Sequence, residues 1–168
     1  MNRDADLSER VARIEDELAI RQLVLTYGPS ADAGLADRAA SVWLPEGEYD
    51  WDADGTPHQG REAVEAMLLG DGHQGLIRSG VAHFAGPPLI EVDGDRATAL
   101  TYSLIMRREP DTSRFYLWRV SAARWDLERR SGTWGVRRRV NRLMDETGAG
   151  RTLFGDTLAE RFEGGPPR

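Results

Sequence analysis

The residue whose type and neighbours best fit proton transfer is His83, one of three histidines in the chain. It lies in the stretch GVAHFAGPP, between small and aromatic residues, whereas His58 and His73 lie in glycine-, aspartate- and glutamine-rich stretches where we expect loops. Imidazole titrates near neutral pH, so it can act as a general base in an apolar pocket. A core histidine bonded to a backbone carbonyl has the same kind of neighbours. The residues around His83 leave both interpretations open.

Several other kinds of chemistry lack the residues that they need. The sequence contains no cysteine, which excludes disulfides, thiolate metal ligands and cysteine nucleophiles. All 22 basic residues are arginine, so no side-chain amine can form a Schiff base. Neither HxH nor HExxH occurs, and a glycine-rich phosphate loop and a GxSxG turn are also missing. We therefore expect no metal and no cofactor.

The acidic residues leave one further alternative open. Glu48, Asp50 and Asp52 follow one another at alternate positions, and a glycosidase-like carboxylate pair would need two such groups. We favour the simpler interpretation, in which they line the solvated edge of a strand.

The charge and hydropathy of the chain indicate which classes of partner it binds. The net charge of −6 argues against nucleic acid, and we expect the basic run RRRVNR (137–142) to be a solvated strand face with salt bridges. The N-terminus is charged and lacks an apolar core, and no apolar run is long enough to cross a bilayer. These features predict a cytoplasmic protein without membrane contact.

The first half of the chain has helical periodicity. Apolar residues at steps of three and four from Leu7 to Tyr27 predict an amphipathic helix, which Pro29 should kink or end. A short helix is expected from Leu35 to Trp43 and another over 61–69. The glycine-rich stretch GDGHQGLIRSG (70–80) is expected to be a mobile loop.

The second half changes to a period of two. PLIEV and RATALTYSLIMRR should form a hairpin at the Asp93-Gly94 turn, and two longer strands should join at Ser131-Gly132. The tail TLFGDTLAERF is expected to be helical and EGGPPR to be disordered. The order predicts one α+β domain, a cone-shaped curved antiparallel sheet with the N-terminal helices packed on its concave face.

Four segments carry a resemblance to a known family. They are AIRQLVLTYGPSADAGLADRAASVWLPEGEYD, GREAVEAM, AHFAGPPLIEVDGDRATA and WDLERRSGTWGVRRR. Over residues 7–145 the chain resembles a SnoaL-like member of the nuclear-transport-factor-like superfamily. The resemblance implies a cystatin-like α+β barrel over that range, followed by a C-terminal helical segment and tail over 146–168.

The resemblance also implies an activity. Scytalone dehydratase, bile-acid dehydratases and a lindane dehydrochlorinase use a histidine oriented by an aspartate to remove a proton from an alicyclic substrate. The matching residues are His83 and Asp32, and they imply a cofactor-independent lyase or isomerase for a small alicyclic or polycyclic substrate. A non-catalytic module of the same fold, which binds a hydrophobic ligand or a partner, is the alternative.

Further pocket residues follow from the same resemblance and from strand periodicity. The resemblance implies pocket positions at Tyr27, Met106, Ser121 and Arg142. The period of two adds Tyr102, on the face of Met106, and Trp125, on the face of Ser121. Ala31, Ala123 and Met106 replace polar groups of the relatives, which leaves the particular reaction open.

Two expectations concern surfaces. The opposite strand face, with Tyr116, Trp118, Val120 and Ala122, is apolar, so we expect this outer sheet face to join subunits into a dimer or trimer. The C-terminal segment around Phe154 and Leu158 is expected to close the mouth of the cone.

Overall fold

The computed structural model describes residues 3–51 and 56–162, so the predicted disorder of EGGPPR lies outside the described residues. The helices are α1 (Arg3–Asp32), α2 (Ala36–Ala40), α3 (Arg61–Leu69), α4 (Asp71–Ser79) and α5 (Ala149–Arg161). The strands are β1 (Trp43–Asp50), β2 (His58–Gln59), β3 (Val81–Ala85), β4 (Leu89–Asp93), β5 (Arg96–Arg108), β6 (Phe115–Arg130) and β7 (Thr133–Leu143). No helix among these residues is long and apolar enough to span a membrane.

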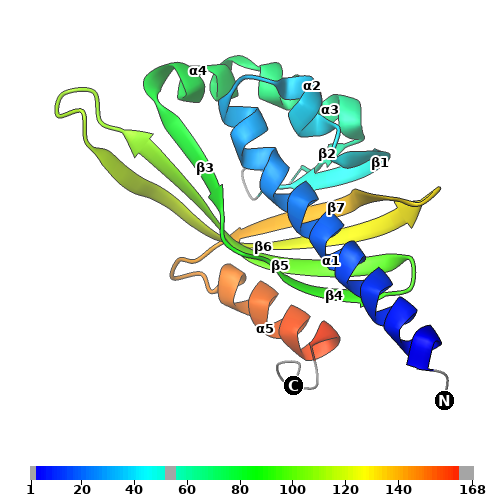
Figure 1. Cartoon of the computed structure of the whole chain (residues 1–168). Helices are drawn as coiled ribbons and strands as arrows, with labels where there is room; N and C mark the ends of the chain where they lie inside the picture. Colours follow the sequence, from blue (N-terminus) through cyan, green and yellow to red (C-terminus); the bar gives the residue numbers. More distant parts are fainter. Residues whose placement is uncertain (1–2, 52–55, 163–168) are drawn as a thin grey trace.

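The strands form one seven-stranded sheet in the order β2-β1-β7-β6-β5-β3, with β4 also paired to β5. All pairs are antiparallel except β1 with β7. The sheet is curled without closing, and α1 crosses its hollow side (Figure 1). The predicted α+β fold, with N-terminal helices on the concave face, is therefore confirmed, as are both hairpins.

Helices α1 and α5 lie on opposite faces of the sheet, and neighbouring residues of β6 show this. Arg124 reaches Glu160 of α5 with its Nη1 at 2.8 Å, whereas the ring of Trp125 lies 6.3 Å from that of Tyr27 on α1. Successive strand side chains point to opposite faces. We call these the α1 face and the α5 face.

Helix α1 continues past Pro29 to Asp32, so of the two predicted effects of the proline, an end of the helix is wrong. Proline lacks only one backbone donor, and the carbonyl of Pro29 still accepts a hydrogen bond from the Ala33 amide at 3.0 Å. Apolar packing outweighs the lost bond, because a stripe along α1 is buried against the sheet: Ile20, Val24, Tyr27 and Ala31.

Helix α4 occupies the stretch predicted to be a loop. Its glycines disfavour a helix by propensity. However, His73, Leu76 and Ile77 lie at spacings of three and four residues, and all three are partly buried on one side. Tertiary contact therefore decides the conformation here. The short helix α2 also ends earlier than predicted, because Trp43 already begins β1.

A bulge near the start of β6 changes which face of the sheet its first residues occupy. The pairing with β5 shifts between Ile105 and Met106, so Leu117 pairs with Met106 while Arg119 pairs with Ile105. Leu117 and Arg119 consequently lie on opposite faces, although regular alternation would place them on the same one. A period of two cannot reveal an extra residue of this kind.

Candidate active site

Asp32 and His83 are in direct contact across 51 residues of sequence. The Asp32 Oδ1 lies 2.5 Å from His83 Nδ1, and the His83 backbone amide donates to Oδ2 at 2.7 Å. An ionised carboxylate only accepts hydrogen bonds, so it places the ring proton on Nδ1 and leaves Nε2 without one. The side chains are 14% (His83) and 21% (Asp32) exposed, so neither is fully buried.

The close approach of α1 to β3 makes this contact possible. A Cβ at Gly28 would lie 2.5 Å from the carbonyl oxygen of His83, so only glycine fits there. One turn later, Asp32 is the last residue of α1, where the helix carbonyls favour a neighbouring positive charge. The end of α1 therefore places the Asp32 carboxylate beside the His83 ring.

Tyr27 forms the wall beside this pair. Its ring lies edge-on to His83 with 6.5 Å between centroids. Burial raises the pKa of Tyr27 well above its usual value, and Tyr49 adds to the effect. The Tyr27 phenol therefore stays neutral.

Arg139 is the buried cation of the site, and the sequence analysis missed it. Its guanidinium lies over the rings of Trp125, Tyr27 and Tyr49, at 4.1, 4.5 and 4.8 Å from their centroids. Only 3% of the residue is exposed. The expectation of a wholly solvated RRRVNR strand is wrong here, because alternation turns Arg139 inward while Arg138 points outward to Glu48.

A pair of serines connects Arg139 to a second arginine. Ser103 of β5 faces Ser121 of β6 in the sheet register. Arg139 Nη2 donates to Ser103 Oγ at 3.3 Å, and Arg119 Nε donates to Ser121 Oγ at 3.3 Å. Ser121 thus lies on the α1 face together with Trp125, although Trp125 is fully buried in the core rather than lining open space.

His73 is a further neighbour that the sequence analysis placed in a loop. Its ring stacks on that of His83 with centroids 5.6 Å apart. Its Nδ1 lies 3.1 Å from the Leu68 carbonyl, which requires the proton on Nδ1 and leaves Nε2 as an acceptor without a partner. Burial, and then the charge of His83, lower the pKa of His73. The helical periodicity of α4 was the signal that could have placed it.

Tyr102 and Met106 do not belong to this group. Tyr102 is 52% exposed, and its ring meets Phe154 of α5 with centroids 5.0 Å apart. His83 pairs with Ile105, and Met106 follows it with the opposite orientation. Both residues therefore lie on the α5 face, and the prediction that they face the pocket is wrong. Phe154 meets Tyr102 on that face, and closure of the cone by the C-terminal segment stays a prediction.

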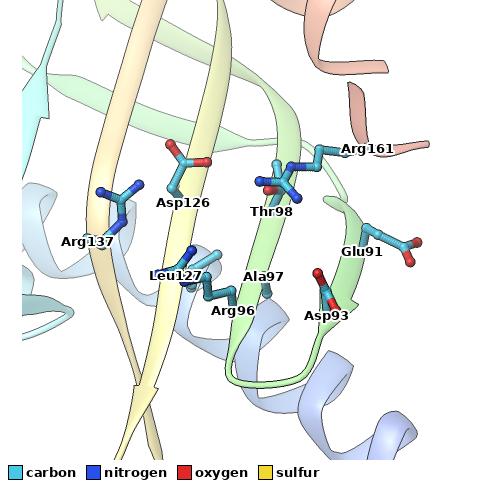
Figure 2. Close-up of a pocket in the computed structure, with 9 residues that line it drawn as sticks. All are labelled: Glu91, Asp93, Arg96, Ala97, Thr98, Asp126, Leu127, Arg137 and Arg161. Atoms are coloured by element: carbon cyan, nitrogen blue, oxygen red, sulfur yellow. The ribbon is translucent and has the colours of Figure 1, made fainter. Parts of the chain in front are cut away.

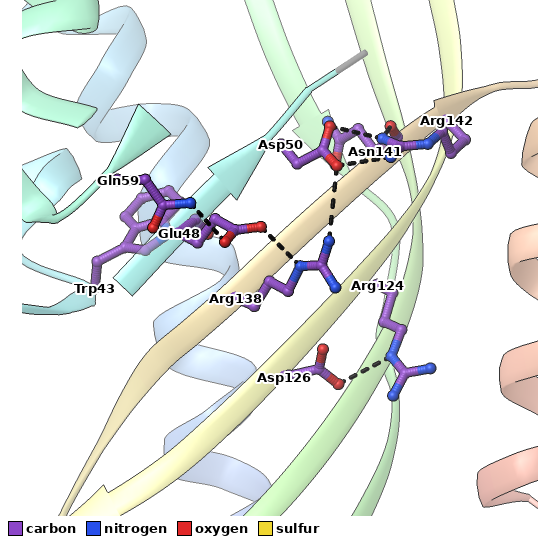
Figure 3. Close-up of polar contacts among 9 residues, drawn as sticks. All are labelled: Trp43, Glu48, Asp50, Gln59, Arg124, Asp126, Arg138, Asn141 and Arg142. Atoms are coloured by element: carbon purple, nitrogen blue, oxygen red, sulfur yellow. Dashed lines mark hydrogen bonds and ion pairs between the residues drawn. The ribbon is translucent and has the colours of Figure 1, made fainter. Parts of the chain in front are cut away.

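Arg142, the arginine predicted for the pocket, also lies on the α5 face. Its two terminal nitrogens bind Asp50 at 2.8 and 2.6 Å, as Figure 3 shows. The same figure shows Arg138 paired with Glu48. The two carboxylates considered for a glycosidase pair are thus held by arginines, and Asp52 lies outside the described residues.

Two surface hollows lie beside α5. The smaller, of about 60 Å³, is shown in Figure 2, where Arg161 of α5 reaches toward Thr98. The larger, of about 680 Å³, lies between α5 and strands β6 and β7, and acidic and basic side chains line it together. Neither contains His83. The described residues hold no cluster of three possible metal ligands.

Comparison with known proteins identifies relatives. Residues 12–140 match the SnoaL-like domain family. A crystal structure of an NTF2-like protein with a cystatin-like fold from Novosphingobium aromaticivorans is 38% identical, with a TM-score of 0.84 over 89% of this chain and 95% of that one. No curated protein matches the chain.

A more distant neighbour has a named activity. The hexachlorocyclohexane dehydrochlorinase LinA-type3 from Novosphingobium barchaimii is 18% identical, with a TM-score of 0.67 over 81% of this chain and 91% of that one. At this identity the likeness shows the fold alone.

Proposed function

The chain belongs to the SnoaL-like domain family, and from this premise we propose that it is a cofactor-independent lyase or isomerase of the dehydratase type. Its substrate is a small alicyclic or polycyclic compound, from which His83 removes a proton. Asp32 holds the His83 ring. The contact between these two side chains is the observation that carries the proposal.

The geometry supports a general base. With its Nδ1 proton held by Asp32, His83 presents Nε2 as the atom that takes the substrate proton. The imidazolium that results keeps Asp32 as a counter-charge, which lowers the free energy of the charged intermediate. A ring carbon next to a carbonyl loses its proton by this step, and loss of water or return of the proton elsewhere on the ring completes the reaction.

The residues around the pair support a negative intermediate. The neutral phenol of Tyr27 and the guanidinium of Arg139 lie next to each other, 4.5 Å apart from ring to Cζ. Donors and fixed positive charge stabilise an oxyanion best when water is excluded. Ser121 lies on the same face of the sheet, and the buried Trp125 packs against the rings and guanidinium of Tyr27 and Arg139. Tyr102, Met106 and Arg142 lie on the other face.

Proton exchange tests this function without knowledge of the natural substrate. We expect the protein to catalyse deuterium exchange next to the carbonyl of cyclic ketones such as indanone in heavy water, measured by NMR. His83→Ala should slow the catalysed exchange by about 10²-fold or more, the usual contribution of a general base. Tyr102→Phe, on the other face, is the matched control. Equal rates for wild type and His83→Ala would refute the proposal.

The alternative is a non-catalytic module that binds a hydrophobic ligand. The fully buried Trp43 and Trp125 favour it, because they fill part of the interior. The same experiment separates the two. A ketone that binds, detected by its effect on tryptophan fluorescence, but exchanges no faster than in buffer supports the module.

Self-association is part of the proposal, although only part of the outer sheet face is available for it. Helix α5 covers Ala122, which is fully buried. The start of β6 is exposed on both sides, with four large apolar residues more than 40% exposed: Phe115, Tyr116, Leu117 and Trp118. Such a patch is typical of an interface. A cytoplasmic location also remains a prediction.

A further inference from the structure

The arginines of the sheet differ in what balances their charge. Arg124, Arg138 and Arg142 of the α5 face all form ion pairs with carboxylates. Arg119 and Arg139 form none with any residue that the structure describes. Arg119 binds Ser121, the Trp51 carbonyl at 2.9 Å and the Trp51 ring at 5.6 Å, and every one of these partners is neutral.

Both of these arginines reach the same place on the α1 face. Their guanidinium groups approach the cross-strand pair Ser103–Ser121 from its two sides. The register also aligns His83 of β3, Ile105 of β5 and Arg119 of β6 in one row across the sheet. Arg119 therefore shares a cross-strand row with the proposed base. Arg139 stacks on Tyr27, whose ring lies beside that base.

Within residues 3–51 and 56–162, which the structure describes, protein groups do not balance the local charge. Arginine stays protonated, so this region carries two positive charges against the single carboxylate of Asp32, which His83 already engages. Arg139 Nη1 is buried and has no hydrogen-bond partner in the part of the chain that the structure describes. An unpaired buried cation is costly to folding, even when aromatic rings reduce the cost. An acidic ligand would provide the missing counter-charge and the missing acceptor.

We propose that the substrate carries a carboxylate, which binds at Arg119 and Arg139 while its ring carbon lies against His83. The proposal rests on the proposed function for the placement of the ring carbon. Arg119 is only half-buried and meets the ligand first, and Arg139 lies behind it. Guanidinium groups bind carboxylates with two parallel hydrogen bonds, so the pair would also fix the orientation of the ring.

Binding of a matched pair of probes tests the carboxylate. The probes are 3-oxocyclohexanecarboxylate and its methyl ester, and quenching of tryptophan fluorescence measures their affinity. Wild type should bind the carboxylate about tenfold or more tightly than the ester, since charge-assisted hydrogen bonds exceed neutral ones by this margin. Arg119→Gln and Arg139→Gln should each reduce that preference. Arg138→Gln, the neighbour of Arg139 on the other face, should retain it.

Each further outcome has a defined meaning. Thermal denaturation identifies a variant that fails to fold. If Arg139→Gln fails to fold, Arg119→Gln still tests the proposal, because Arg119 is only half-buried. Equal affinity for carboxylate and ester, or a preference that survives both substitutions, overturns the proposal. Inorganic phosphate is the third probe, and if it binds as tightly as the ring carboxylate, the site holds a free anion and the proposal also fails.

Proton exchange separates this proposal from the proposed function. If the carboxylate binds through the arginines but His83-dependent exchange is absent, the function fails and the anion site stands. If exchange depends on His83 but ester and carboxylate react equally, the anion site fails and the function stands. When both hold, Arg119→Gln should raise KM for the carboxylate and leave KM for the ester unchanged.

Discussion

The two faces of the sheet use the same residue types in opposite ways. On the α5 face, Arg142 meets Asp50 through two hydrogen bonds, and Arg124 meets Asp126 and Glu160. On the α1 face, Arg139 lies among aromatic rings with one nitrogen unpaired. Both faces carry arginines, and the presence of a carboxylate partner distinguishes them. Paired charges stabilise a surface, whereas unpaired buried groups persist where a ligand uses them.

The largest expected effect is a loss of activity when the Asp32 carboxylate, on the α1 face, loses its charge. Asp32→Asn keeps the shape of the side chain but removes the charge that orients and stabilises protonated His83. We expect a loss on the order of 10²-fold in ketone proton exchange. Asp126→Asn, which disturbs the ion pair with Arg124, is the matched change on the α5 face and should leave exchange unchanged. A similar loss in both variants would remove the functional contrast between the faces.

The next largest expected effect is a loss of stability when a methyl group is added to α1 at Gly28. In Gly28→Ala the new Cβ would lie 2.5 Å from the His83 carbonyl oxygen, which forces α1 away from β3. We expect the free energy of unfolding to fall by about 1–3 kcal/mol, as for other overpacked sites. Gly155→Ala on α5 has no atom within 4 Å of its new Cβ. It should instead raise stability by about 0.5–1 kcal/mol through helix propensity. Chemical denaturation of both variants measures the difference.

A paired arginine on the α5 face should matter for stability alone. Arg142→Gln removes both hydrogen bonds to Asp50, whose side chain is 11% exposed. We expect the free energy of unfolding to fall by about 1–3 kcal/mol, the usual contribution of hydrogen bonds to a charged group. Proton exchange per folded molecule should match wild type. If Arg142→Gln reduces proton exchange without lowering stability, Arg142 belongs to the site after all.

The smallest effect concerns the acid sensitivity of His73. Burial lowers its pKa in the folded protein, so the unfolded chain binds a proton there more readily. Stability should consequently fall as pH drops from about 6.5, the ordinary histidine value, toward the lower folded value. The charged or titratable neighbours in this effect are His83 and Asp32. His73→Gln should flatten that decline in denaturation curves recorded between the two pH limits, and an unchanged pH dependence would contradict the prediction.

Much of the architecture could be predicted because it depends on local pattern. The period of two in β4 to β7 and the turns at Asp93-Gly94 and Ser131-Gly132 produced strands and hairpins that the structure confirms. The predictions failed where tertiary contacts outweigh local propensity. Pro29 lies inside a helix because α1 is buried along one side, and α4 forms in a glycine-rich stretch because His73 and its neighbours pack inward.

The site was predictable only in part. The resemblance named His83 and Asp32, and the structure brings these two side chains together, although their catalytic role remains a proposal. It placed Arg142 in the pocket, whereas the inward arginine is Arg139, three residues earlier and on the other face. Tyr102 was assigned to the wrong face of the sheet for the same reason. In a strand, a shift by an odd number of residues moves a side chain to the opposite face, so approximate matching cannot assign it.

The sequence by itself determined the classes of element, the absence of thiol and amine chemistry, and an acidic chain with arginine as its sole basic side chain. These follow from composition and periodicity, which are properties of short stretches. Only the tertiary structure decided which arginines have carboxylate partners and which nitrogen of His83 is free. Those properties depend on contacts between residues far apart in the chain, such as the 51-residue separation of Asp32 and His83, and on which face of the sheet each side chain occupies.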